Sequence, residues 1–273
     1  QLWMDKDQVE NASMIKIDIL SNRGLSQLID IDKKDMTLYP EKDIRTLQIF
    51  RQGDNLGITH SESRAMMKVF KTMQPKNIKE LAIALALIRP AASKNYQKSY
   101  FLRDYTPYKY DNSNFIIFDD DATRYIKKLL NCKESDADIY RRAFAKNKTK
   151  IKKKFNYNLN LVERDYQKKQ QIIERLEQLQ YYSFCKSHAF SYAQLIYCLA
   201  YQKAHNPKQF WLSSLNNCNS SFRKWVHFRE ANYVGIKLNP GKRPFKLVDD
   251  EFNTFLRETR AEEQTSLLVK KIE

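Results

Sequence analysis

The stretch SDADIYRRAFAKNKTKIKKK, from Ser135 to Lys154, decides how the rest of the chain is interpreted. At helical period one side of it is apolar and carries Ile139, Tyr140, Ala143 and Phe144. The other side is cationic and carries Arg141, Arg142 and Lys148, with Lys146 at its flank. A guanidinium group donates two parallel hydrogen bonds to phosphate oxygens, and a lysine ammonium group adds a point charge. The pattern predicts a helix that packs on a core and presents either a polyphosphate-binding face or a merely solvated one.

The start of this helix carries a local signal. Ser135 followed by Asp138 is a close variant of the capping box, in which two side chains satisfy amide groups of the first helical turn. We therefore expect the helix to begin near Asp136.

The chain is strongly basic, and its 273 residues suffice for a sizeable core. It has 48 Lys plus Arg against 32 Asp plus Glu, a formal net charge of +16 at pH 7. Sixteen Tyr and fifteen Phe are interleaved with the basic residues. Nucleic acid offers phosphates to the cations and bases to the rings, so it is the expected partner in preference to a membrane surface.

Composition also excludes several kinds of site. The four cysteines and four histidines have neither zinc spacing nor the pattern of a disulfide framework. The five glycines form neither a P-loop nor a Rossmann fingerprint. No apolar run reaches membrane-spanning length and no signal peptide opens the chain, so we expect a soluble, intracellular protein.

Near the N-terminus, MIKIDIL at Met14–Leu20 alternates at period two and predicts a strand with its isoleucines on one face. Lys16 and Asp18 project together from the other face. A carboxylate beside a lysine on a rigid strand is one element of a metal and phosphate site, but more often it is an ordinary ion pair.

Most of the remaining pattern is helical, so the predicted fold class is mainly α with a small β contribution. Helices are expected around 25–29, 44–50, 66–73, 78–88, 125–130, 162–179, 186–205 and 206–215. Ser61 or Ser63 and Asn77 are candidate caps, and Gly53 is a candidate stop. The apolar run at 115–118 predicts a short buried strand or turn.

Three consecutive acids, Asp119, Asp120 and Asp121, follow that run. Carboxylates are ligands for hard divalent cations. Acidic residues are also typical of the first turn of a helix, whose positive end they stabilise, and a helical pattern begins at this point. The helix-start interpretation is the favoured one.

Two further segments carry candidate binding residues. KNYQKSYFLRDYTPYKY at 94–110 alternates aromatic and basic residues and suits either single-stranded DNA or a packed surface loop. The DNA-binding candidates are Lys94, Lys98, Arg103, Tyr105 and Tyr108, with Lys150, Lys152 and Lys153 of the lysine run. Lys186, Ser187 and His188 open a long helix and form an anion-binding corner rather than a hydrolase dyad, because no G-x-S-x-G elbow surrounds the serine.

Seven stretches resemble motifs of a known family in the same order and at compatible spacing. They read KIDILSNRGL at 16–25, IFRQGDNLGITHSES at 49–63, ALIRPAA at 86–92, FDDD at 118–121, ADIYRRAFAKNK at 137–148, YYSFCKSHAFSYA at 181–193 and AYQKAHNPKQF at 200–210. The similar motifs are KFDFLGLRTL, LQRGDTLGVFQLES, ALxRPGP, YQEQ, ADLLRRAMGKKK, GYGFNKSHAAAYA and AYxKAHYPxxF of the bacterial replicative DNA polymerase III alpha subunit, the C-family polymerases. The resemblance extends over about four-fifths of the chain.

The resemblance implies a multi-helix fingers region attached to a short palm strand. It implies a palm edge at 1–24 with its catalytic strand at 14–20, fingers at 25–230, and a partly irregular end of the fingers at 231–273. Asp18 takes the place of a catalytic carboxylate that ligates Mg²⁺, and Lys16 that of its neighbour near the primer end. The implied nucleotide-binding residues are Arg89, Arg141, Arg142, Lys146, Lys148, Lys186, Ser187 and His188. The implied reaction is two-metal nucleotidyl transfer with dNTP and primer-template DNA.

The sequence also departs from the family pattern. It has no P-D-F-D-x-D-F segment, which carries the other two catalytic aspartates, so Mg²⁺ would be shared with carboxylates outside this chain. We therefore expect part of a divergent DNA-directed DNA polymerase, inactive alone and completed by the missing palm and thumb segment. The alternative is a non-catalytic nucleic-acid-binding protein derived from such fingers. Either would be cytoplasmic, in a bacterium or in the replication compartment of a virus or phage host, without a membrane partner.

Overall fold

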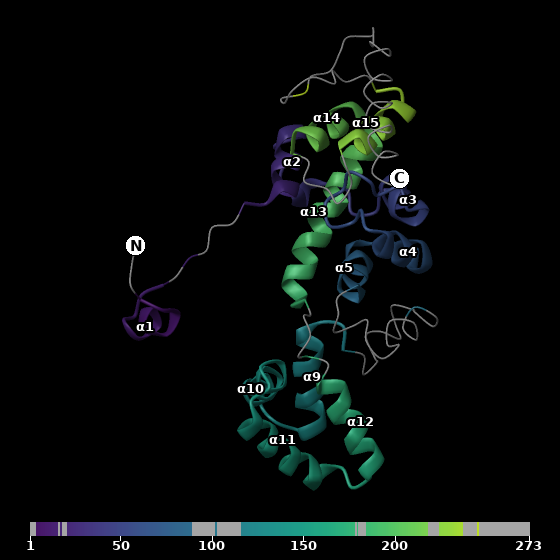
Figure 1. The fold of residues 1–273 in the computed structure, drawn as a ribbon. Coiled ribbons are helices and arrows are strands. Elements are labelled where there is room, and N and C mark those ends of the chain that lie inside the picture. Colours follow the sequence, from purple (N-terminus) through teal and green to yellow (C-terminus); the bar gives the residue numbers. More distant parts are fainter. Residues whose placement is uncertain are drawn as a thin grey trace, which may run out of the picture.

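The computed structural model describes residues 4–15, 17, 21–88, 102, 116–177, 179, 184–217, 224–236 and 245. These residues are mainly helical, and two groups of helices follow the short helix α1 (Lys6–Asn11) (Figure 1). The predicted predominance of helix is thereby confirmed. No described helix is both long and apolar enough to cross a membrane.

The larger group is built around the long helix α13 (Lys186–His205). Its other members are α2 (Arg23–Ile31), the 3-10 turn η1 (Met36–Leu38), α3 (Ile44–Gln52), α4 (Arg64–Met73), α5 (Ile78–Leu87), α14 (Pro207–Asn217) and α15 (Lys224–Tyr233). Helix α13 contacts α2, α3, α5 and α14, and its residues from Leu195 to Ala200 are buried. A helix that is apolar on most of its circumference belongs inside a core, and α13 lies there.

Local signals set the ends of these helices. The side chains of Asn22, Asp43, Ser63 and Asn77 each accept a hydrogen bond from the amide three residues ahead and so cap α2, α3, α4 and α5. Gly53 ends α3 in the left-handed conformation, with φ of 74°. The predicted caps at Ser63 and Asn77 and the predicted stop at Gly53 are confirmed.

The smaller group contains α9 (Asp119–Leu130), α10 (Glu134–Ala145), α11 (Thr149–Val162) and α12 (Tyr166–Glu177). It has a core of its own, in which Phe144 and Phe155 are fully buried. The Phe155 ring meets Tyr140 and Phe144 edge to face, with centroids 5.4 and 5.1 Å apart.

The stretch from Ser135 to Lys154 differs from its prediction. Helix α10 begins at Glu134, its N-cap Lys133 makes no side-chain hydrogen bond, and the predicted capping box is therefore wrong. The stretch also forms two helices, because Asn147 takes the left-handed conformation with φ of 49° between α10 and α11.

Two further helix predictions are corrected. Ile139 was expected in the core but is 49% exposed, because the face that meets the neighbouring helices carries Ala137, Tyr140 and Phe144 instead. The helix predicted at 162–179 starts only at Tyr166, since the Asp165 carboxylate accepts hydrogen bonds from the amides of residues 167 and 168.

Little β structure occurs among the described residues. Phe118 and Phe184 form an isolated parallel bridge, and the Asp119 amide donates to the Phe184 carbonyl at 3.0 Å. This agrees with the short buried segment predicted at 115–118. In the strand predicted at 14–20, the described Ile15 and Ile17 are 87% and 77% exposed and carry no strand pairing, while Lys16 and 18–20 lie outside the described residues. The small β contribution therefore stays a prediction.

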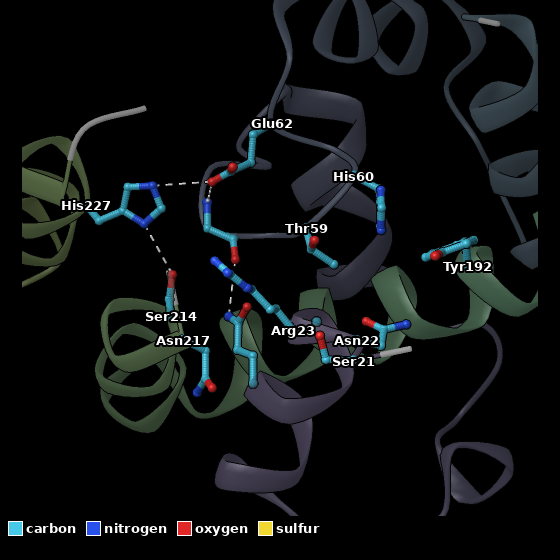
Figure 2. A pocket seen from close by; sticks show the side chains of 13 residues that line it. Ser21, Asn22, Arg23, Thr59, His60, Glu62, Tyr192, Ser214, Asn217 and His227 are labelled. Carbon is cyan, nitrogen blue, oxygen red and sulfur yellow. Dashed lines mark hydrogen bonds and ion pairs between the residues drawn. The ribbon is translucent and has the colours of Figure 1, made fainter. Parts of the chain in front are cut away.

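A buried polar network fixes the loop between α3 and α4 against α2, α14 and α15 (Figure 2). The Gly57 amide donates to the Glu62 carboxylate at 2.8 Å, and its carbonyl accepts from the Gln27 amide at 3.1 Å. His227 lies 3.3 Å from Glu62 and 3.2 Å from the Ser214 hydroxyl. Burying so many polar groups costs little only when they satisfy one another, as they do here.

The network predicts a dependence of stability on pH. Burial, together with the charge of Lys203, lowers the pKa of His227 from 6.5 to about 4. The unfolded chain therefore binds more protons between these pH values, so the free energy of unfolding should be greatest above pH 6.5 and fall by about 2 to 3 kcal/mol towards pH 4. Chemical denaturation over this range should show a shallower fall for His227→Gln. Parallel pH profiles for the two proteins would contradict the assignment.

Candidate functional site

The first turn of α9 holds the candidate site together, beginning with Asp121. This carboxylate is almost fully buried and accepts hydrogen bonds from the amides of Ile117 and Phe118 at 3.0 and 2.9 Å. It also pairs with Arg124 at 2.7 Å. Asp121 therefore fixes the start of the helix, and the helix-start interpretation of the three acids is confirmed.

The other two aspartates reach neighbouring helices. The Asp119 carboxylate pairs with Arg141 of α10 at 3.4 Å. The Asp120 carboxylate accepts a hydrogen bond from the Lys186 amide, the first of α13, at 2.6 Å. Adjacent side chains of one turn thus connect α10 with the N-terminus of α13, two elements that are more than forty residues apart in the sequence.

The paired arginines of α10 differ in their surroundings. Asp138 bonds both of them, with Arg141 Nε at 2.8 Å and Arg142 Nε at 2.7 Å. Burial raises the pKa of Asp138, but the hydrogen bonds and charges of the two arginines outweigh it, so the pKa lies below its ordinary value. The Arg141 side chain is only 18% exposed, whereas that of Arg142 is 66% exposed. Arg141 therefore links helices, and Arg142 is accessible to a ligand.

A cavity of about 560 Å³ lies where α9, α10 and the start of α13 meet. We call it the junction cavity. Its lining residues are charged or hydroxylic and comprise Asp120, Thr123, Arg124, Lys127, Glu134, Ser135, Asp138 and Lys186. Lys127 pairs with Glu134 at 2.9 Å, and both side chains are largely exposed. Cations and carboxylates face the same space, and Arg141 and Arg142 are not among the residues that line it.

The other residues predicted at the start of α13 are exposed. Cys185 is the N-cap and makes no capping hydrogen bond with its side chain. Ser187 and His188 follow on the surface, and the His188 ring lies 5.2 Å from that of Phe184 and 4.6 Å from that of Tyr192. Lys186 is the member of the predicted corner that lines the junction cavity.

The lysines that follow α10 are distributed differently from the prediction of a single cationic face. Lys146, Lys148, Lys150 and Lys153 are exposed. Lys146 lies roughly 16 Å along the helix from Ser135, at 1.5 Å per residue, and so at the opposite end of α10 from the cavity. Lys152 instead bonds Glu177 at 2.8 Å and covers the Phe144 ring at 5.2 Å, which gives it a role in packing.

The remaining predicted site residues, Lys16, Asp18, Arg89, Lys94, Lys98, Arg103, Tyr105 and Tyr108, lie outside the described residues. Within the described part of the chain, no group of three His, Cys, Asp or Glu side chains is placed to hold a metal ion. Sequence reasoning missed Thr123, Arg124 and Lys127, although their spacing from Asp120 puts all of them on one face of a helix.

The chain is similar in sequence to known proteins. A family model described as the bacterial DNA polymerase III alpha subunit finger domain matches residues 14–163. The chain is 27% identical over 250 residues to a DNA polymerase III subunit alpha of Thermotoga maritima, a match that covers 86% of this chain and 29% of that protein. Subunits of the same name from Staphylococcus epidermidis and Staphylococcus aureus are 26% identical over 85% of this chain and 24% of their own length. The chain thus spans about a quarter of the length of these relatives.

The role of Asp121 can be tested through stability. Asp121→Ala should lower the free energy of unfolding by about 2 to 4 kcal/mol, because it removes a cap and leaves two buried amides without a partner. Asp136→Ala, at an exposed position in the first turn of α10, is the control and should change stability by less than about 0.5 kcal/mol. Equal denaturation midpoints for the two variants would show that Asp121 does not fix the turn.

Proposed function

Since the chain belongs to the bacterial DNA polymerase III alpha subunit finger domain family, we propose that it binds the triphosphate of an incoming dNTP as part of a DNA-directed DNA polymerase. The proposed phosphate contacts are Arg142 of α10 and Lys186 of α13. The whole polymerase activity, its primer-template DNA and its other protein segments enter this proposal through the family, because the chain spans only a part of its relatives.

The observation that carries the proposal is the connection made by the first turn of α9. Asp119 bonds Arg141, and Asp120 bonds the Lys186 amide, so that α10 and the N-terminus of α13 are held on two sides of the junction cavity. Both elements offer donors that suit phosphate, since one carries a paired guanidinium group and the other a positive helix end with a lysine. The resemblance assigns these residues to one site. Lys186 and Asp138 line the cavity, and Arg142, which is not a lining residue, pairs with Asp138 at 2.7 Å.

The carboxylates around the cavity are compatible with this role. Arg142 is 66% exposed in its pair with Asp138, and Lys127 and Glu134 are 49% and 74% exposed. Ion pairs that water reaches contribute only about 0 to 1 kcal/mol each. A triphosphate, which carries several negative charges on one group, can therefore replace Asp138 as the partner of the Arg142 guanidinium at little cost. Asp119 and Asp138 would continue to hold Arg141 in place.

The metal-dependent part of the proposal rests on the family alone. Mg²⁺ neutralises and positions phosphates in nucleotidyl transfer when it is bound by several carboxylates. The described residues do not provide such a group of ligands, and Asp18 and Lys16 lie outside them. The assignment of Asp18 as a metal ligand and of Lys16 as its neighbour therefore stays a prediction from the sequence.

Primer-template DNA is the second proposed partner. Lys150 and Lys153 are exposed on α11, and Lys146 and Lys148 precede them at the turn. Cations on a rigid helix neutralise backbone phosphates without regard to base sequence. We propose that this surface follows the DNA backbone while the junction cavity holds the nucleotide.

Arg142→Ala tests the nucleotide assignment. Titration of the 273-residue chain with a fluorescent dNTP analogue should show a loss of about 1.5 to 3 kcal/mol in binding free energy, which is typical of a charge-assisted hydrogen bond. The fold should be unaffected, because this side chain is mostly exposed. Arg164→Ala, at an exposed arginine between α11 and α12, is the matched control and should bind as the parent does. Identical affinities for the two variants would refute the assignment.

A further inference from the structure

Another cavity, of about 470 Å³, lies in the smaller helix group, where α9 and α12 stand side by side (Figure 1). We call it the α9–α12 cavity. One wall is a face of α9 that carries Tyr125, Lys128 and Leu129, and the other is a face of α12 that carries Lys168, Ile172 and Arg175. None of its lining residues is shared with the junction cavity, so the two are separate sites.

Cations outnumber carboxylates in the α9–α12 cavity, whereas the junction cavity has equal numbers of both. Lys128, Lys168 and Arg175 share the α9–α12 cavity with one carboxylate, that of Glu163, which accepts a hydrogen bond from the Asp165 amide at 3.0 Å. Lys128 and Lys168 are exposed, and within the part of the chain that the structure describes their ammonium groups make no hydrogen bond or ion pair. Both are therefore available to carboxylates from outside the chain.

The α9–α12 cavity also has an apolar wall. Ile172 belongs to the core of the smaller helix group, and the partly buried Leu129 packs against that core. The Arg175 guanidinium lies over the Tyr125 ring, 5.6 Å from its centroid, so this face of the ring is already covered by a cation of the chain. A ligand for such a cavity must therefore combine anionic groups with aliphatic or aromatic side chains.

The spacing of the cations selects a ligand with several charges. Lys168 and Arg175 are seven residues apart in α12, which places their backbones about 10 Å apart along the helix axis. An extended peptide rises about 3.3 Å per residue, so carboxylates three residues apart match that distance. Nucleic acid also offers repeated charges, but the wall of Leu129 and Ile172 favours the apolar side chains that a peptide carries between its carboxylates.

We infer that the α9–α12 cavity binds an acidic segment of another protein, with carboxylates on Lys128 and Lys168 and an apolar side chain against Leu129 and Ile172. Charge complementarity orients such a segment, and burial of its apolar side chain adds affinity. The inference goes beyond the proposed function and involves no residue of the proposed nucleotide site.

The test measures binding of fluorescent peptides to the 273-residue chain by anisotropy. The probe DLFDLFD carries a carboxylate at every third position with apolar side chains between, NLFNLFN lacks the charges, and DSGDSGD lacks the apolar groups. The parent should bind DLFDLFD about tenfold or more tightly than either of the other two peptides, because both halves of the interaction are needed.

Two double variants locate the binding site. Lys128→Gln with Lys168→Gln should weaken DLFDLFD binding about fivefold or more. Lys133→Gln with Lys154→Gln is the matched control, because it removes the same charge from exposed lysines of the same helix group that do not line the cavity. The control should change the affinity by less than about twofold, since exposed charges outside the site contribute little. All four side chains are exposed, so both variants should fold as the parent does.

Three results would overturn the inference. One is equal affinity of the two double variants for DLFDLFD. Another is that the parent binds DSGDSGD as tightly as DLFDLFD, because the apolar wall would then contribute nothing. The third concerns a short oligodeoxythymidylate, which should bind equally to the two double variants since they carry the same charge. If the oligonucleotide loses as much affinity as the peptide on Lys128→Gln with Lys168→Gln relative to the control, the cavity binds a nucleic-acid strand instead.

Discussion

The arrangement of the candidate nucleotide site depends on the hydrogen bonds made by the first turn of α9. Asp121 fixes the turn by accepting two backbone amides, Asp119 binds Arg141 of α10, and Asp120 binds the first amide of α13. These contacts lie next to the Phe118–Phe184 bridge. Together with that bridge they join the two helix groups. The turn thus brings α10 and the N-terminus of α13 to one cavity.

Burial separates the charged side chains at this junction into those that hold helices together and those that a ligand can reach. Arg141 is mostly buried and bonds two carboxylates, so releasing it would leave buried charge without a partner. Arg142 is exposed and can exchange its carboxylate for phosphate at little cost. The same distinction separates Lys152, which packs on Phe144, from its exposed neighbours on α11. A pattern of positive residues in the sequence therefore contains both cations that anchor helices and exposed cations, to which the proposed ligand contacts belong.

Sequence alone predicted features that depend on neighbouring residues. The caps at Ser63 and Asn77 and the acidic start of α9 each need only a few adjacent residues, and all are confirmed. The capping box at Ser135 failed because α10 begins at Glu134, two residues before the predicted start, so that Ser135 lies inside the helix and not at its N-cap. The polar cavity of about 460 Å³ at the start of α2 was not predicted, because Arg23, His60 and Tyr192 line it from three segments that are distant in the sequence. The palm edge, the catalytic role of Asp18 and the aromatic loop at 94–110 stay predictions.

In the proposed function, α10 and the N-terminus of α13 form one phosphate site. A double-mutant cycle measures this directly, with dNTP affinity determined for Arg142→Ala, Lys186→Ala and the combination. If both side chains bind the same triphosphate, removing either one weakens the contribution of the other to binding. The change in binding free energy of the double variant should then differ from the sum of the two single changes by about 0.5 kcal/mol or more. A cycle with Arg164→Ala in place of Arg142→Ala should be additive. Additivity in the Arg142–Lys186 cycle as well would show that the two residues do not act on one ligand.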